Sequence, residues 1–252
     1  MFLYFGKKWI NKGEMPDAIK SAFLLGMIFL VRPVNVLAAG WLVFEAGGFM
    51  LLVQRKIQLF RSPRHAVLSV LGLILPFAIQ LTIWKIQTGS WFVNSYGEES
   101  FHFLQPHLFD FLFSYRKGLF VYLPITLVAL FGIIPLWKRD RIRAVIAALF
   151  FLTTTYILSC WWMWYYGGSF GTRVIVEFLP MFALLLYFFL DSLKSKAAKI
   201  AGFSLVILLT FFCQFQTHQY RYMLIHWSEM DSAKYWEVFG KSLVSGTGAD
   251  NQ

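Results

Sequence analysis

The sequence predicts an all-α, polytopic transmembrane helix bundle with about seven membrane segments. Of the 252 residues, 58% are apolar and only 14% are charged, whereas soluble domains typically carry about 25% charged residues. The mean hydropathy is +0.59, and the charges fall in short clusters between long apolar runs. This composition excludes a soluble globular enzyme, a disordered chain and a disulfide scaffold.

Cysteine content and net charge narrow the class further. The two cysteines, Cys160 and Cys213, lie in or beside apolar runs, and we interpret them as small buried hydrophobic residues. They are too few for a cysteine-based zinc site. The net charge of +10 reflects the Lys and Arg bias that membrane proteins show in their loops. No nucleic-acid partner is therefore expected.

The chain opens with a short apolar stretch, residues 1–6, followed by Lys7 and Lys8. This order is the reverse of a signal peptide. We interpret residues 1–20 as the end of a preceding helix and a cytoplasmic loop. Whether the chain is truncated at its N-terminus stays open.

The apolar run 21–53 is too long for one crossing, since about 20 residues of helix span the ~30 Å hydrocarbon core. Arg32, Pro33 and Asn35 interrupt it. Proline restricts the residue before it and suits a first helical turn. We therefore expect two helices that separate between Arg32 and Pro33.

Five further runs have the length and hydropathy of single spans. They are residues 66–86, 119–137, 142–166, 174–190 and 197–215. The expected organisation has a preceding helix end and loop, a helical hairpin plus one span, an outer loop with an interfacial helix, four spans, and an outer C-terminal tail. The corresponding sections are 1–20, 21–86, 87–118, 119–217 and 218–252.

Most of the 23 basic residues fall in one set of loops if the segments alternate across the bilayer. The excess of Lys and Arg on cytoplasmic loops assigns that set to the cytoplasm. The loop 87–118, the turn 161–173 and the tail then face outward. Aromatic clusters near residues 91 and 161–166 suit the outer interface, where amphipathic rings settle.

The outer loop 87–118 carries five polar candidates for acid–base chemistry or metal ligation: Glu98, Glu99, His102, His107 and Asp110. The favoured interpretation is a solvated loop with an interfacial helix. A divalent metal stays an open alternative, and no cofactor is assigned.

Basic residues near the outer span ends are candidates for binding an anionic head group. Arg116 and Lys117 lie at the mouth of the span 119–137. Arg173 begins a predicted helix, and Glu177 follows at i+4 on the same face, where it would orient the guanidinium. An internal ion pair that joins two span ends is the alternative.

Two other features support these candidates. In the turn before Arg173, Gly167, Gly168 and Gly171 permit backbone conformations and close approaches that other residues forbid. Arg32 lies between two apolar helices, and Asn35 shares its surroundings. Because ionisable groups are costly at membrane depth, we treat Arg32 as a candidate functional residue. A structural pairing of Arg32 is the alternative.

Three stretches of this chain resemble the C-terminal half of bacterial GT-C membrane glycosyltransferases, including the family-39 protein mannosyltransferase-like and aminoarabinose-transferase-like enzymes. Residues 26–37 resemble their hairpin with a glycine, an apolar run and Arg-Pro. Residues 112–124 resemble a Leu-Phe-Ser-x-x-x-Gly-Leu-Phe segment that enters a span. Residues 164–180 resemble a Trp-x-x-Gly-Gly-x-x-Gly-x-Arg turn before a helix. The likeness covers nearly the whole chain.

This resemblance implies a GT-C-like fold in the cytoplasmic (inner) membrane of a bacterium, with transfer of a sugar from a polyprenyl-phosphate donor on the outer face. Membrane lipids would be the other partners. By position, Arg32, Arg116, Lys117 and Arg173 match basic places where the family could hold the lipid phosphate.

The family's general base is an acidic residue in the first outer loop, and no residue of this chain matches that place. The catalytic residues are therefore unassigned. Two interpretations stay open: a glycosyltransferase or a fragment of one, and a non-catalytic accessory or lipid or saccharide transport protein.

Overall fold

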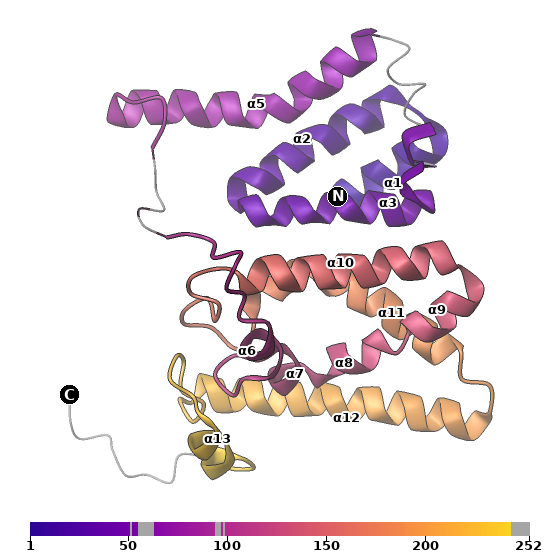
Figure 1. Ribbon diagram of the computed structural model, residues 1–252, viewed down its shortest axis with the longest axis vertical. Helices are drawn as coiled ribbons and strands as arrows, with labels where there is room; N and C mark the ends of the chain where they lie inside the picture. Colours follow the sequence, from indigo (N-terminus) through magenta and orange to yellow (C-terminus); the bar gives the residue numbers. More distant parts are fainter. Residues whose placement is uncertain (51, 55–62, 94–96, 98, 243–252) are drawn as a thin grey trace. The chain divides into compact units, whose positions relative to one another are not determined.

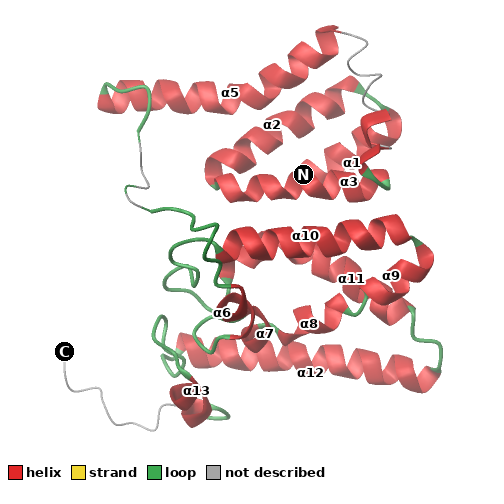
Figure 2. Ribbon diagram, in the orientation of Figure 1, coloured by secondary structure: helices red, strands yellow, loops and turns green. Residues whose placement is uncertain are grey.

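The computed structural model describes residues 1–50, 52–54, 63–93, 97 and 99–242 (Figure 1). Every named element in these residues is a helix (Figure 2). The described residues contain no strand, and their one isolated bridge joins Phe101 to Trp161. The predicted all-α class is confirmed.

The chain divides into two compact units. The first unit comprises Met1–Ser100 and Asp140–Thr154, and the second comprises Phe101–Arg139 and Thr155–Gln252. Each unit therefore takes in segments that are distant in sequence.

The first unit begins with two helices, α1 (Phe2–Lys12) and α2 (Met15–Val31). Helix α1 ends at Gly13, whose φ of 73° is the left-handed conformation that glycine adopts readily. Residues 1–20 thus hold helix α1 and the start of α2, and not the predicted loop. The hairpin buries Asp17, which is 1% exposed and pairs with the Lys8 ammonium at 3.1 Å.

The predicted break between Arg32 and Pro33 is confirmed. Helix α2 ends at Val31, Arg32 is extended, and Pro33 opens the 3-10 helix η1 (Pro33–Ala39). Helix α3 (Gly40–Ala46) continues directly from it. Proline lacks an N–H and cannot extend α2, but its fixed φ suits the start of the next helix.

Helix α2 packs against the long helix α5 (Pro63–Thr88). A Cβ at Gly26 would collide with the carbonyl oxygen of Leu73, and one at Gly72 would lie 3.2 Å from the carbonyl oxygen of Ile19. Small residues of this kind let two membrane helices approach closely.

In the second unit, the predicted single span 119–137 is wrong. It forms three short helices: α7 (Leu119–Tyr122), α8 (Pro124–Leu130) and α9 (Ile133–Arg139). Pro124 cannot continue α7, and Leu123 before it is non-helical with φ −130° and ψ 61°. Gly132 lies between α8 and α9, where the backbone of helix α11 (Leu179–Asp191) comes too close for any side chain.

The ends of the later elements also differ from the prediction. Helix α10 (Arg141–Ser159) stops before the aromatic cluster 161–166. Residues 173–178 form the 3-10 helix η2 (Arg173–Phe178), which leads into α11. Helix α12 (Lys196–Arg221) continues past the expected end at residue 215.

The C-terminal tail folds against the end of α12. In α12, Gln216 donates from Nε2 to the hydroxyl of Tyr235 at 2.7 Å, and Gln219 donates to the carbonyl oxygen of Val238 at 2.7 Å. Both acceptors belong to α13 (Ser232–Val238). The tail is therefore partly structured, although the prediction gave it no element. Within the loop 87–118, residues 108–113 form the short helix α6 (Leu108–Phe113).

Four helical segments of the described chain, not seven, are long and apolar enough to cross a membrane. They are Pro63–Thr88, Arg141–Ser159, Arg173–Asp191 and Lys196–Arg221. In the 18-residue apolar stretch of each helix, only 11% of Pro63–Thr88 and 6% of Lys196–Arg221 is buried within the protein. Water-exposed apolar surfaces of that extent are unusual in soluble monomers, whereas lipid solvates them.

We expect Gly132→Ala to destabilise the protein by about 1–3 kcal/mol, because the added methyl group would push the backbones of α9 and α11 apart. The matched control is Gly202→Ala, whose Cβ would meet only the ends of the Leu193 and Leu190 side chains, which can shift, and no backbone atom. Thermal unfolding in detergent measures both variants. Equal melting temperatures for the two would contradict the close approach of α11 to Gly132.

Candidate functional site

The turn between α6 and α7 presents Arg116 and Lys117. The backbone N–H of Gly118 donates to the carbonyl oxygen of Ser114 at 2.7 Å, and the N–H of Arg116 donates to the Ser114 hydroxyl at 3.1 Å. A Cβ at Gly118 would lie 2.5 Å from that same carbonyl oxygen. Only glycine therefore closes this turn without displacing its backbone.

Lys117 is the buried centre of the site, with a residue exposure of 2%. Its ammonium donates to the carbonyl oxygen of Ser169, and its own carbonyl oxygen accepts a hydrogen bond from the Thr172 hydroxyl. The ammonium also lies 5.6 Å from the centre of the Tyr220 ring. Such a contact stabilises a cation through the ring quadrupole. Lys117 thus connects α7, the turn 161–173 and the end of α12.

Arg116 joins the same turn to the C-terminal tail. Its Nε donates to the carbonyl oxygen of Ser228 at 2.6 Å. Its guanidinium carbon lies 3.5 Å from the centre of the Tyr165 ring. The guanidinium is half-buried, so part of its donor set is free to meet a ligand.

Arg173 begins η2 and is exposed. Burial, together with the positive charges of Arg116 and Arg173, lowers the pKa of Lys117 from its ordinary value of 10.5 to about 8. Lys117 lies in a turn outside the long apolar helices. The lowered pKa shows that the three cations act on one another.

These three cations are not neutralised by the described residues. The ion pairs found in the second unit join other side chains, and no carboxylate of the described chain is within ion-pair distance of Arg116, Lys117 or Arg173. We call these three residues the cation cluster. Uncompensated positive charge beside a buried ammonium favours an anionic ligand.

The glycines of the turn 161–173 have distinct roles. Gly167 and Gly171 have φ of 69° and 52°, which side chains rarely adopt. A Cβ at Gly168 would lie 2.9 Å from the Trp227 ring, and one at Gly171 would lie 3.0 Å from Cβ of Tyr122. Larger residues at these positions would therefore prevent the backbone of this turn from packing beside Lys117.

The segment that carries Arg173 and Glu177 is not the α-helix that the sequence predicts at this point. Residues 173–178 form a 3-10 helix, in which residues i and i+3 align, rather than i and i+4. The α-helical i, i+4 alignment on which that pairing was based is therefore absent, and the pairing itself stays a prediction.

The described polar residues of the loop 87–118 are divided between the two units. Glu98 lies outside the described residues, and Glu99 belongs to the first unit. In the second unit, Nδ1 of His107 is 3.3 Å from a carboxylate oxygen of Asp110, and the backbone N–H of His102 donates to the carbonyl oxygen of Cys160. Across the described ranges, no three His, Cys, Asp or Glu side chains gather as metal ligands.

Arg32 and Asn35 lie in the first unit, where α2 gives way to η1. Arg32 is half-buried and Asn35 is buried. The cation cluster is built entirely from the second unit, so these two residues are not part of it.

No family model, curated protein or solved structure matches this chain.

Several contributors to the site were not predicted from the sequence. They are Tyr165, Ser169, Thr172, Tyr220 and Ser228. Ser169 and Thr172 lie beside the predicted glycines, so the neighbourhood was identified but not its contacts. Tyr220 and Ser228 follow a span that was expected to end earlier, and no motif marks them.

We expect the buried Lys117 to make stability depend on pH. Between pH 8 and 10.5 the unfolded chain binds more protons than the folded one, so unfolding becomes less favourable as pH rises through this window. Lys117→Met removes this rise and is more stable than the native protein below pH 8. The measurement is the melting temperature in detergent from pH 7 to 10.5.

The control for this experiment is Lys199→Met, which replaces an exposed lysine of α12. It is expected to follow the native profile. A native profile parallel to that of Lys117→Met would contradict burial of a titrating ammonium.

Proposed function

We propose that this chain is a membrane glycosyltransferase, or a fragment of one, that takes a sugar from a polyprenyl-phosphate donor on the outer face of a bacterial cytoplasmic membrane. The observation that carries the proposal is the cation cluster: a buried ammonium between two arginines, with no carboxylate of the described chain to neutralise them. Within this proposal, the cluster binds the donor phosphate.

Phosphate chemistry suits these three side chains. A guanidinium offers planar paired donors that match two phosphate oxygens, and an ammonium acts as a compact point charge. Arg173 is exposed and Arg116 half-buried, so both have room for a ligand. Burial and the repulsion from Arg116 and Arg173 together lower the pKa of Lys117, and a bound anion would offset both effects.

The position of the cluster along the chain suits a lipid-linked phosphate. Its residues adjoin the start of α7 and the start of the span 173–191, and Lys117 touches Tyr220 near the end of α12. A polyprenyl phosphate has its charge at the membrane surface and its chain in the bilayer. Basic groups at the ends of apolar helices would meet the phosphate, and the apolar helices would contact the polyprenyl chain.

The resemblance to GT-C glycosyltransferases supports the same function, because Arg116, Lys117 and Arg173 lie inside two of the three similar stretches. The basic loops that we assign to the cytoplasm put the cluster on the outer side. The role proposed for these residues is donor binding, and the catalytic base is not assigned to any of them.

The proposal is tested by the binding of polyprenyl phosphate to the purified full chain in detergent. Arg173→Ala is expected to weaken binding at least about tenfold, equivalent to ~1.4 kcal/mol, because one charge-assisted contact to the phosphate is lost. The matched control is Lys199→Ala, an exposed basic residue on α12, which should bind as the native chain does. Unchanged affinity in Arg173→Ala would defeat the proposal.

A transfer measurement distinguishes the enzyme from an accessory protein. The chain is reconstituted in vesicles with a radiolabelled polyprenyl-phosphate sugar, and label is followed into membrane acceptors. Transfer that Arg173→Ala abolishes supports the enzyme. Donor binding without transfer favours the alternative, a non-catalytic accessory or lipid or saccharide transport protein.

A further inference from the structure

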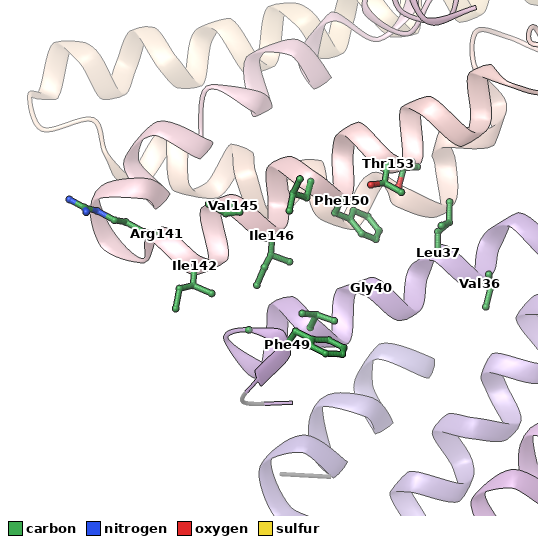
Figure 3. A pocket seen from close by; sticks show the side chains of 14 residues that line it. Val36, Leu37, Gly40, Phe49, Arg141, Ile142, Val145, Ile146, Phe150 and Thr153 are labelled. Atoms are coloured by element: carbon green, nitrogen blue, oxygen red, sulfur yellow. The ribbon is translucent and has the colours of Figure 1, made fainter. Parts of the chain in front are cut away.

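The first unit contains an apolar groove between helix α10 and the segment formed by η1 and α3. Its volume is about 700 Å³, within the ~300–1,000 Å³ that is usual for ligand sites. Ile142 and Ile146 point from α10 toward Gly40 and Phe49 across the groove (Figure 3). All of these residues belong to one compact unit.

The two walls of the groove are held together by contacts at several points. The Nε of Arg143 donates to the carbonyl oxygen of Phe44 at 3.1 Å, and the ring of Trp41 meets that of Phe150 edge-on at 6.1 Å. Gly40 has no side chain, and a Cβ at this position would lie 3.1 Å from the Phe150 ring. The groove is thus a feature of a packed interface and not a gap between loose segments.

The lining is apolar except at its two ends. Arg141 is the one charged residue among the described residues that line the groove, and it lies at one end of the row on α10, with Thr153 at the other (Figure 3). Along an α-helix these two positions are about 18 Å apart. That length is close to the ~15 Å of hydrocarbon in one leaflet of a bilayer.

Among the described residues, Arg141 differs from two nearby arginines in having no ion-pair partner. Arg139 pairs with Asp191 at 3.0 Å, and Arg143 pairs with Asp140 at 2.8 Å. In the part of the chain that the structure describes, no carboxylate pairs with Arg141, which is exposed. The groove therefore ends in an available positive charge.

We propose that this groove binds one anionic phospholipid, with an acyl chain along α10 and the head-group phosphate at Arg141. The apolar walls match the chain in length, and the charge at one end matches the phosphate. The exposed lining residues Ile142 and Leu149, at 57% and 56%, would be covered by the lipid. This site lies in the first unit and does not depend on the donor function proposed for the second.

The test is native mass spectrometry of the full chain in detergent, titrated with phosphatidylglycerol or with phosphatidylcholine of the same acyl chains. The native chain is expected to retain one phosphatidylglycerol and to bind phosphatidylcholine more weakly. Arg141→Ala should lower phosphatidylglycerol affinity about fivefold, the effect of one basic residue beside anionic lipid. Leu149→Trp should fill the groove and reduce the binding of both lipids.

Arg139→Ala is the matched control, because Arg139 is a neighbouring arginine that does not line the groove. It should bind lipid as the native chain does. If Arg141→Ala does not fold, as judged by its melting temperature, Arg141→Gln carries the same comparison.

Any one of several results would overturn the proposal. These include equal affinity for the two phospholipids, native affinity in the Arg141 variant, native binding in Leu149→Trp, and a dimer in place of the lipid adduct. Displacement of phosphatidylglycerol by an equimolar polyprenyl phosphate would also overturn it, because the groove would then hold an isoprenoid chain. The donor proposal is judged separately, by the Arg173 variant.

Discussion

The burial of the Lys117 ammonium is the constraint on which the organisation of the second unit depends. An unpaired charge removed from water costs several kcal/mol unless polar groups compensate it. Here the compensation comes from the carbonyl oxygen of Ser169 and the ring of Tyr220. The carbonyl oxygen of Ser169 can reach Lys117 only if the turn 161–173 folds inward. Gly171 permits this fold because it adopts a left-handed conformation, and Gly168 permits it because a side chain there would collide with Trp227.

The two units treat a buried charge in opposite ways. In the first, Asp17 and Lys8 form a compensated pair whose charges cancel. In the second, Lys117 is surrounded by neutral partners and two further cations. An ion pair such as that of Lys8 and Asp17 serves a purely structural role. The second keeps a net positive charge beside the ends of apolar helices, which is a costly state unless an anion is bound. This contrast is the physical argument for a ligand at the cation cluster.

Local chemistry explains which parts were predictable. The break after Arg32 follows from the adjacent Pro33, and the spans near residues 66–86 and 197–215 follow from hydropathy alone. Hydropathy counts side chains and ignores the backbone, so it missed the interruptions at Leu123 and Gly132. Residue type identified Arg116, Lys117 and Arg173 as candidates. Their contacts join positions 52 and 112 residues apart, and no local pattern carries that information.

The interruption of the segment 119–137 has a consequence for biosynthesis. Helices α8 and α9 pack against α11, which lies later in the chain and leaves the ribosome after them. The junction between α8 and α9 keeps backbone hydrogen bonds: the N–H of Gly132 donates to the carbonyl oxygen of Ala129 at 2.9 Å, and the N–H of Ile134 donates to that of Phe131 at 3.2 Å. The faces of α8 and α9 that contact α11 therefore lack their partner until α11 has been synthesised, and this part of the second unit can complete its packing only then.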